Sequence, residues 1–267
     1  MPVDRWADAD AYERYMGRWS RSLARDFVRW LAVPPSAGWL EVGCGTGSLT
    51  TAICEDGAPA SVVACDAADD FVAFCRERLR YPALTVVASP KDGLPAGASG
   101  FDAVVSSLVL NFLPDTNRAL VQMRAACRPG GRVAACVWDY AEGMEFLRAF
   151  WDAAVAVDPG AAALHEGARL PLCRPDALRA AFVSAGLEAV EVAALTIPTP
   201  FASFEDFWAP FVDGPGPAPS YLASLSPESR RLLEERLHAL LFPAEGKPAR
   251  LRARAWAVRG YSPAASR

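Results

Sequence analysis

A glycine-rich turn at Gly43–Gly47 is the part of the sequence best suited to hold a polar ligand. It follows a short apolar run, residues 39–42, and precedes a helical pattern, as at the junction of a buried strand and a helix. Glycine lets the backbone approach a ligand closely, and the free N–H groups of the helix form a polar cradle. The pattern is Glu41 followed by G-x-G-x-G. It fits neither the dinucleotide fingerprint G-x-G-x-x-G, whose sixth position here is Ser48, nor a P-loop, because no Lys-Ser or Lys-Thr pair follows.

An acid at the end of the next predicted strand, Asp66, could complete a nucleoside site. It lies 66 − 47 = 19 positions after Gly47, near the ~20 expected of an acid that binds ribose hydroxyls. A carboxylate suits this role because it can accept hydrogen bonds from two neighbouring hydroxyls. The alternative is that Asp66 only caps the helix that begins near Asp69.

Few residues could transfer a proton. Of the two histidines, His238 falls in an amphipathic helix and is interpreted as a surface or packing residue. His165, beside Glu166 in a predicted loop, is the candidate general base. Asn111 follows a predicted strand, and we assign it to the reacting end of the site for its shape and polarity.

Composition excludes several classes of function. The seven cysteines are scattered without a C-x-x-C pair, so we expect reduced core residues and no metal site. A net charge of −4 argues against a nucleic-acid-binding surface. No apolar stretch approaches the ~20 residues of a membrane span, and the N-terminus has no signal-peptide core. We therefore expect a cytoplasmic protein that binds a small molecule and neither nucleic acid nor a membrane.

The elements that position these residues alternate in the first half of the chain. After the strand at 39–42, strands are predicted at 61–66, 84–88, 101–106 and 133–138. Helices are predicted between them at 47–55, 69–80 and 114–127, with Pro114 at the helix start. Apolar strands separated by helices indicate a parallel sheet covered on both faces.

The second half adds helices and two strands. Helices are predicted at 144–158 and 175–185, and strands at 187–198 and 251–260. Residues 199–249, rich in proline and aromatic residues with a helix at 227–241, are interpreted as a lid inserted between these strands. At the N-terminus, residues 4–32 form an amphipathic helical stretch in which Gly17 and Ser20 suggest a break and a new N-cap.

Four segments together resemble the ubiquinone/menaquinone-type small-molecule methyltransferases of class I, which use S-adenosylmethionine (SAM). They are Glu41–Gly47, Asp66, Gly100–Ser106 and Arg128–Gly131, and the resemblance covers about residues 36–138. Three further segments are similar to an uncharacterised bacterial branch of that family: Tyr15–Arg21, Leu108–Phe112 and Val137–Tyr140.

This resemblance implies an α/β fold with a Rossmann-like, doubly wound sheet of seven mostly parallel strands, the last antiparallel. The ligand would then lie at the carboxyl ends of the first strands, in agreement with the rule for open α/β sheets. The expected domains are a helical cap (1–36), a SAM-binding core (37–198), the lid insertion (199–249) and a last strand with tail (250–267).

The resemblance also implies SAM as cofactor, S-adenosylhomocysteine as product and a small-molecule substrate; we expect a monomer or homodimer. The predicted cofactor-binding residues are Glu41, Gly43, Cys44, Gly45, Gly47, Asp66, Ala67, Ser89, Asp92, Ser106, Trp19, Arg18 and Arg21. The predicted substrate-binding residues are Tyr15, Phe112, Trp138, Tyr140 and Trp208. Arg18 or Arg21 would pair with the SAM carboxylate. The aromatic residues of 199–249 favour an apolar or aromatic substrate.

One position departs from the family pattern. After the third strand the family usually has Gly-Asp-Ala, whose Asp contacts the adenine amine, whereas here Pro90 stands nearest to that Asp. Either Asp92 substitutes through a shifted turn, or backbone groups alone bind the adenine.

The predicted activity is methyl transfer, in which the protein mainly orients the acceptor; orientation can lower a barrier by ~7–11 kcal/mol. The main alternative is a protein that binds SAM without methylating, as a cyclase or a binding module, and its cofactor site would look the same. A third possibility, an NAD-dependent oxidoreductase, is disfavoured by Ser48, which stands where the fingerprint needs its third glycine.

Overall fold

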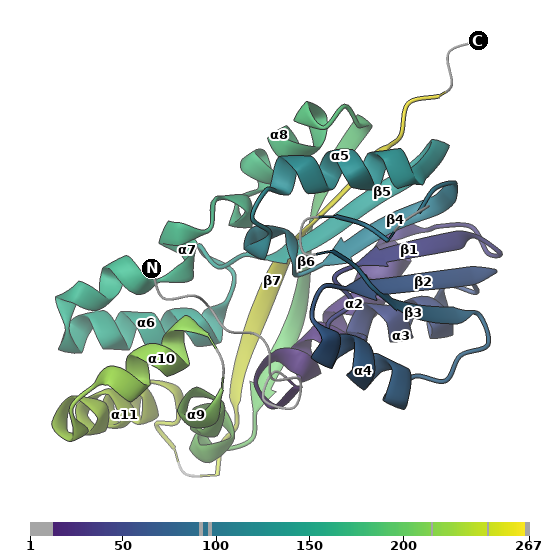
Figure 1. The fold of residues 1–267 in the computed structure, drawn as a ribbon. Helices are drawn as coiled ribbons and strands as arrows, with labels where there is room; N and C mark the ends of the chain where they lie inside the picture. Colours follow the sequence, from purple (N-terminus) through teal and green to yellow (C-terminus); the bar gives the residue numbers. More distant parts are fainter. Residues whose placement is uncertain (1–12, 91–92, 96–97, 215, 245, 265–267) are drawn as a thin grey trace. The chain divides into compact units, whose positions relative to one another are not determined.

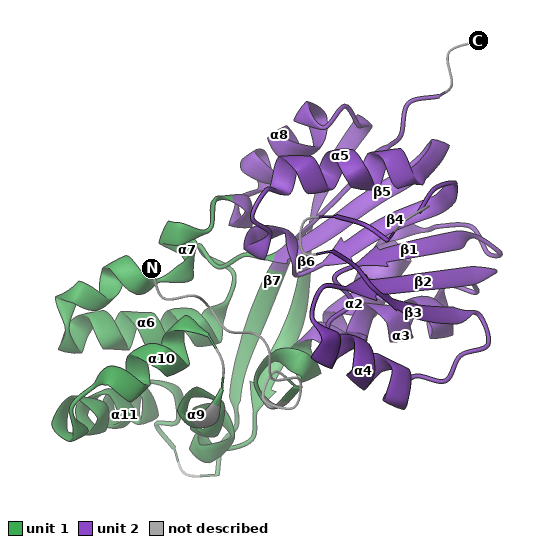
Figure 2. Cartoon of the chain, in the orientation of Figure 1, with its two compact units in different colours: residues 1–19, 138–171, 196–254 green, residues 20–137, 172–195, 255–267 purple. Residues whose placement is uncertain are grey.

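The computed structural model describes residues 13–90, 93–95, 98–214, 216–244 and 246–264. The chain divides into two compact units (Figure 2). Unit 1 comprises residues 1–19, 138–171 and 196–254. Unit 2 comprises residues 20–137, 172–195 and 255–267.

Seven strands form one sheet in the order β3-β2-β1-β4-β5-β7-β6 (Figure 1). Their bounds are Gly38–Val42, Ser61–Asp66, Leu84–Ala88, Phe101–Ser107, Cys127–Trp138, Glu188–Phe201 and Ala249–Tyr261 for β1 to β7. Strands β1 to β5 pair in parallel. Backbone hydrogen bonds join Gly130 to Ser262 and Asp139 to Arg254, so β7 runs antiparallel to β5. This confirms the predicted mostly parallel, Rossmann-like sheet with an antiparallel last strand.

Helices cover both faces of the unit 2 part of the sheet. Figure 1 shows α5 (Thr116–Ala126) and α8 (Pro175–Ser184) on one side. On the other lie α2 (Arg18–Leu31), α3 (Ser48–Asp56) and α4 (Asp69–Arg78). Apolar strand residues such as Leu40, Val104 and Val133 are fully buried in this core, as expected of strands covered on both faces.

Unit 1 contains most of the remaining helices. They are the π-helix η1 (Glu13–Gly17), α6 (Glu145–Val157), the 3₁₀-helix η3 (Pro159–Leu164), α7 (Glu166–Arg169), α9 (Phe204–Asp213), α10 (Pro217–Ser224) and α11 (Pro227–Leu241). Two further 3₁₀ turns are η2 (Leu110–Phe112) and η4 (Pro171–Cys173). Among the described residues, no helix is both long and apolar enough to cross a membrane.

Several predicted boundaries are wrong, among them the start of β5, which lies at Cys127 and not at Val133. The change near Gly17 is a passage from π-helix η1 into α2, and Ser20 lies buried inside α2 instead of capping a new helix. Helix α5 begins at Thr116, because the Asp115 side chain, one residue after Pro114, accepts a hydrogen bond from the Arg118 amide and acts as the N-cap. The predicted loop around 164–166 is helical on both sides of His165.

Candidate functional site

The glycine turn after β1 has a backbone that only glycine adopts freely. Gly43, Gly45 and Gly47 have φ of 76°, 51° and 83°, all in the left-handed region. A Cβ on Gly43 would lie 2.6 Å from a Val109 methyl group, and one on Gly47 would lie 2.6 Å from a Leu79 methyl group. A Cβ on Gly45 would have nothing within 4 Å. The middle of the turn is therefore open, while its two ends are packed against side chains.

Asp66, at the end of β2, holds this turn in place. One carboxylate oxygen accepts a 2.8 Å hydrogen bond from the Gly45 amide, and the other accepts a 2.9 Å bond from the Ala68 amide. Each oxygen keeps a second lone pair, so the carboxylate can still accept hydroxyl hydrogen bonds. The side chain does not cap α4, whose N-cap residue is Ala68 without a side-chain bond.

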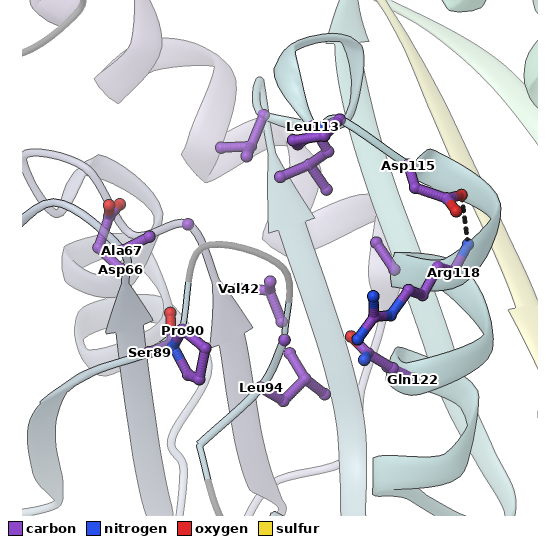
Figure 3. Close-up of a pocket in the computed structure, with 15 residues that line it drawn as sticks. Val42, Asp66, Ala67, Ser89, Pro90, Leu94, Leu113, Asp115, Arg118 and Gln122 are labelled. Atoms are coloured by element: carbon purple, nitrogen blue, oxygen red, sulfur yellow. Dashed lines mark hydrogen bonds between the residues drawn. The ribbon is translucent and has the colours of Figure 1, made fainter.

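A pocket of about 360 Å³ extends from Asp66 across the ends of β1 and β3 to helix α5. Figure 3 shows Asp66, Ala67, Ser89 and Pro90 on one side and Leu113, Asp115, Arg118 and Gln122 on the other. Val42 and Gly43 also line it, so the pocket begins at the glycine turn. It brings together four predicted cofactor-binding residues: Gly43, Asp66, Ala67 and Ser89.

The pocket and turn fit a nucleoside such as the adenosine part of SAM. Asp66 would bind ribose hydroxyls, and the apolar walls at Ala67 and Leu113 suit a flat base. The open side of Gly45 lets a ligand approach the backbone closely. The residues present therefore fit the cofactor.

Two predicted cofactor-binding residues are held by the protein itself. The Glu41 side chain is buried and accepts a 2.5 Å hydrogen bond from the Thr50 hydroxyl. Burial raises the pKa of this carboxyl well above its ordinary value, against the opposing effect of the Thr50 bond. The Ser106 hydroxyl donates a 2.8 Å hydrogen bond to the Val42 carbonyl and so joins β4 to β1. Both residues support the turn from inside the core.

Cys44, in the turn, is a protonated thiol. A hydrogen bond with Cys75, followed by burial, raises the pKa of the Cys44 thiol far above its ordinary value. A thiolate nucleophile is therefore not available there. All seven cysteines are free, and the described residues contain no cluster that could hold a metal ion.

Asn111 and Phe112 lie in the 3₁₀ turn η2 after β4. The turn follows Val109, whose side chain covers Gly43, so both residues belong to the neighbourhood of the glycine turn. The Asn111 amide oxygen is buried without a hydrogen-bond donor among the described residues. Such an oxygen is suited to receive a donor from a ligand.

The other predicted substrate-binding residues lie in unit 1. Tyr15, Trp138, Tyr140 and Trp208 are all buried. Tyr15 contacts Phe211 edge-to-face at 5.8 Å between ring centroids, and Phe211 stacks on Phe150 at 4.6 Å. Burial, followed by the charges of Glu166 and Tyr140, raises the pKa of the Tyr15 hydroxyl well above its ordinary value. Tyr15 is therefore a neutral phenol.

His165 serves as a helix cap. Its Nδ1 accepts a 3.0 Å hydrogen bond from the Gly167 amide at the start of α7. The proton of the neutral ring then lies on Nε2. Burial lowers the pKa of this imidazole, and the positive charges of Arg148 and Arg169 add to that effect against the charge of Asp152.

Glu166 is a buried acid, whereas the sequence predicts a loop at this position. Only 5% of it is exposed, and its Oε2 accepts a 2.7 Å hydrogen bond from the Trp151 indole. In the sequence, only its position next to His165 could have drawn attention to it. A charged residue in a predicted loop is ordinarily exposed to solvent. Its indole partner lies fifteen positions away in α6, which no local pattern connects to it.

Arg18 and Arg21 differ in environment. Arg21 is exposed, whereas Arg18 is half-buried and donates a 2.8 Å hydrogen bond to Asp206 of α9. The Arg18 guanidinium lies 4.2 Å from the ring centroid of Trp19, which is also a predicted cofactor-binding residue. Asp92 lies outside the described residues, so its contact with adenine stays a prediction, while Pro90 lines the pocket.

Comparisons with known proteins agree with this site. Residues 40–135 match the profile of the Methyltransferase domain family. A biotin biosynthesis bifunctional protein BioCD from Bordetella avium is 32% identical over 54% of this chain and 33% of its own length. A demethylmenaquinone methyltransferase from Shouchella clausii is 28% identical over 42% of this chain and 50% of its own length. The chain thus spans half or less of these curated relatives.

Solved structures share the fold over most of the chain. A putative methyltransferase from Bacillus halodurans superposes with a TM-score of 0.58, covering 91% of this chain and 99% of its own at 15% identity. The matched domain includes the glycine turn, Asp66 and the strands that position them. Residues 40–135 thus match a methyltransferase domain, and most of the chain shares its fold with this solved structure.

Proposed function

We propose that the protein transfers the methyl group of SAM to a small, apolar or aromatic organic molecule. The observation that carries the proposal is the pocket that joins the glycine turn to Asp66. A turn with a purely structural role would need neither an open backbone at Gly45 nor a neighbouring carboxylate that can still accept hydrogen bonds.

The cofactor supplies a sulfonium whose methyl group is intrinsically transferable. Residues of this chain then have to bind and orient. Asp66 would hold ribose hydroxyls, Gly45 would allow close backbone approach, and Asn111 would offer an amide oxygen near the turn. Holding reactants in line can lower the barrier by roughly 7–11 kcal/mol.

The acceptor class follows from the composition of unit 1. Its described part has a continuous set of ring contacts that includes Phe150, Phe207, Phe211 and Tyr221. Buried rings of this kind favour apolar and aromatic ligands over nucleic acid or a polar peptide. Residues 199–249 supply most of these rings, and we propose that they act as the lid on the acceptor.

The binding half of the proposal is tested at Asp66. Asp66→Ala removes a charged acceptor and should weaken S-adenosylhomocysteine binding by about 1.5–3 kcal/mol in calorimetric titration. Asp70→Ala, an exposed acid in the first turn of α4, is the matched control and should bind as the wild type does. Equal affinities of the Asp66→Ala variant and the wild type would contradict the site.

The transfer half is tested by release of S-adenosylhomocysteine. A library of small apolar and aromatic molecules, incubated with SAM and the protein, should contain acceptors that raise this release well above the background without acceptor. Mass spectrometry would then show the acceptor increased by one methyl group. SAM binding without release across the whole library would favour the non-methylating alternative.

A further inference from the structure

A second cavity, of about 220 Å³, lies at the amino ends of the parallel strands. Its lining includes Ala37, directly before β1, Asp102, the second residue of β4, and Arg132 of β5. All of its lining residues belong to unit 2. The pocket beside Asp66 lies at the carboxyl ends of these strands, so the two cavities are at opposite ends of the sheet.

Two arginines on neighbouring strands close the carboxyl end of helix α2. Arg132 of β5 and Arg259 of β7 each donate a guanidinium N–H to the carbonyl of Leu31, the last residue of the helix. Arg259 also donates to the Trp30 carbonyl at 2.7 Å. The last carbonyls of a helix have no partner within it and carry its partial negative charge, so cations are favourable there.

The two arginines differ at their Nε–Nη2 edge, the edge that pairs best with a carboxylate. In Arg259, Nε and Nη2 both donate to Oε2 of Glu191, at 3.0 and 2.7 Å. In Arg132, Nη2 donates to the Tyr261 hydroxyl at 3.2 Å, and Nε is buried without a hydrogen-bond partner among the described residues. Arg132 therefore lacks the carboxylate that Arg259 has.

The one carboxylate in the lining, Asp102, is already occupied. Its Oδ1 accepts a 2.5 Å hydrogen bond from Arg128 Nε, and its Oδ2 accepts a 2.8 Å bond from the Gly38 amide. The Gly38 bond, followed by the Arg128 bond, lowers the pKa of this carboxyl below its ordinary value. One carboxylate and two guanidinium groups leave the lining with an excess positive charge, which suits an anion.

We propose that this cavity binds a small organic carboxylate and that Arg132 is the residue that recognises it. One ligand oxygen accepts from Nε, and the other replaces the Tyr261 hydroxyl at Nη2, whose 3.2 Å contact is at the long end of the usual range. Val33, Pro34 and Pro35 give the cavity an apolar wall that suits the hydrocarbon body of the ligand. The site is separate from the cofactor pocket and does not depend on the proposed methyl transfer.

The probe is benzoate, with benzyl alcohol as its neutral counterpart and sodium chloride at equal ionic strength as the salt control. Inorganic phosphate tests a tetrahedral anion. The readout is the Nε–Hε signal of Arg132 in a proton–nitrogen correlation spectrum of the full chain, assigned through its side-chain connectivities. We expect benzoate to shift this signal saturably, whereas benzyl alcohol and chloride leave it in place. The Arg259 signal should not move, because Glu191 already occupies that edge.

Two variants separate binding from the closing of helix α2. Arg132→Lys keeps the positive charge and loses the two-pronged edge, so benzoate affinity should fall about tenfold. Arg259→Lys is the matched control, because it disturbs the same end of α2 but lies outside the cavity lining, and it should bind benzoate like the wild type. In both variants affinity is measured from the backbone amide signal of Gly131, which lines the cavity. Thermal melting checks that each variant folds.

The proposal is wrong if benzoate leaves the Arg132 signal in place or if benzyl alcohol moves it equally. It is also wrong if Arg259→Lys loses as much affinity as Arg132→Lys. A response to phosphate alone would overturn it too, since the site would then recognise a tetrahedral anion. Should Arg132→Lys fail to fold, the wild-type titrations decide alone. Failure of the proposed function would leave all of these results unchanged, because none of them involves SAM.

Discussion

The His165 ring makes a hydrogen bond that one added proton would remove. Its Nδ1 accepts from the Gly167 amide at the start of α7, and burial lowers the pKa of the imidazole below its ordinary value of 6.5. A general base would have to take a proton at Nδ1 and lose this cap, or exchange tautomers. The role of base therefore stays a prediction that competes with a structural one.

The cap predicts how stability depends on pH. Because the folded-state pKa of His165 is depressed, its contribution is present above pH ~6.5 and is lost as the pH falls through the lower folded-state pKa. His165→Asn keeps a capping oxygen that does not titrate. We expect equal free energies of unfolding near pH 8 and a wild-type deficit of about 0.5–2 kcal/mol near pH 5. Urea unfolding measures these free energies. If the wild type and His165→Asn differ by the same amount at both pH values, the capping role is contradicted.

At the scale of the element, the glycine turn separates folding from binding. Gly47 is the N-cap of α3, and a Cβ there would strike Leu79, whereas a Cβ on Gly45 meets nothing within 4 Å. Gly47→Ala should therefore lower the unfolding free energy by about 1–3 kcal/mol. Gly45→Ala should cost only the left-handed strain of about 1–2 kcal/mol.

Ligand binding should give a different ranking. The added methyl group of Gly45→Ala projects into the open space that a ligand would fill. For each kcal/mol of stability lost, we therefore expect Gly45→Ala to weaken S-adenosylhomocysteine binding more than Gly47→Ala does. Thermal melting and calorimetry on both variants check this. If the two losses scale together, the turn has no face dedicated to a ligand.

The elements also show what could be predicted from the sequence. The ranges of β2, β3 and α11 agree with the predicted ones, because apolar runs and a proline-started helix mark their ends. The π-helix at Glu13–Gly17 and the four-residue helix α7 could not be predicted, since neither has a periodic pattern long enough to read. The Arg18–Asp206 pair spans 188 positions and depends on tertiary packing alone.

At the scale of the whole molecule, ligands should change the dynamics of two segments that lie mostly in unit 1. We propose that residues 199–249 and the Tyr15–Arg21 segment become more protected when ligands bind, because lids that exclude water are drawn from segments of low local stability. Hydrogen exchange with S-adenosylhomocysteine and an acceptor found by the release screen should slow in both segments. Helix α8, which contributes no residue to the pocket, serves as the reference that should not change. Unaltered exchange in both segments would make the insertion a purely structural element.

The attachment of that insertion has an evolutionary consequence. The chain leaves the sheet at Phe201 in β6 and returns at Ala249 in β7, and these strands are neighbours in the sheet. Because neighbouring strands hold both ends of the segment close together, a longer segment lowers the stability of the fold only slightly. Each doubling of a loop costs only about 0.6 kcal/mol in closure entropy. Under the proposed function, residues 199–249 could therefore change in length and sequence, and the acceptor with them, without altering the glycine turn or Asp66.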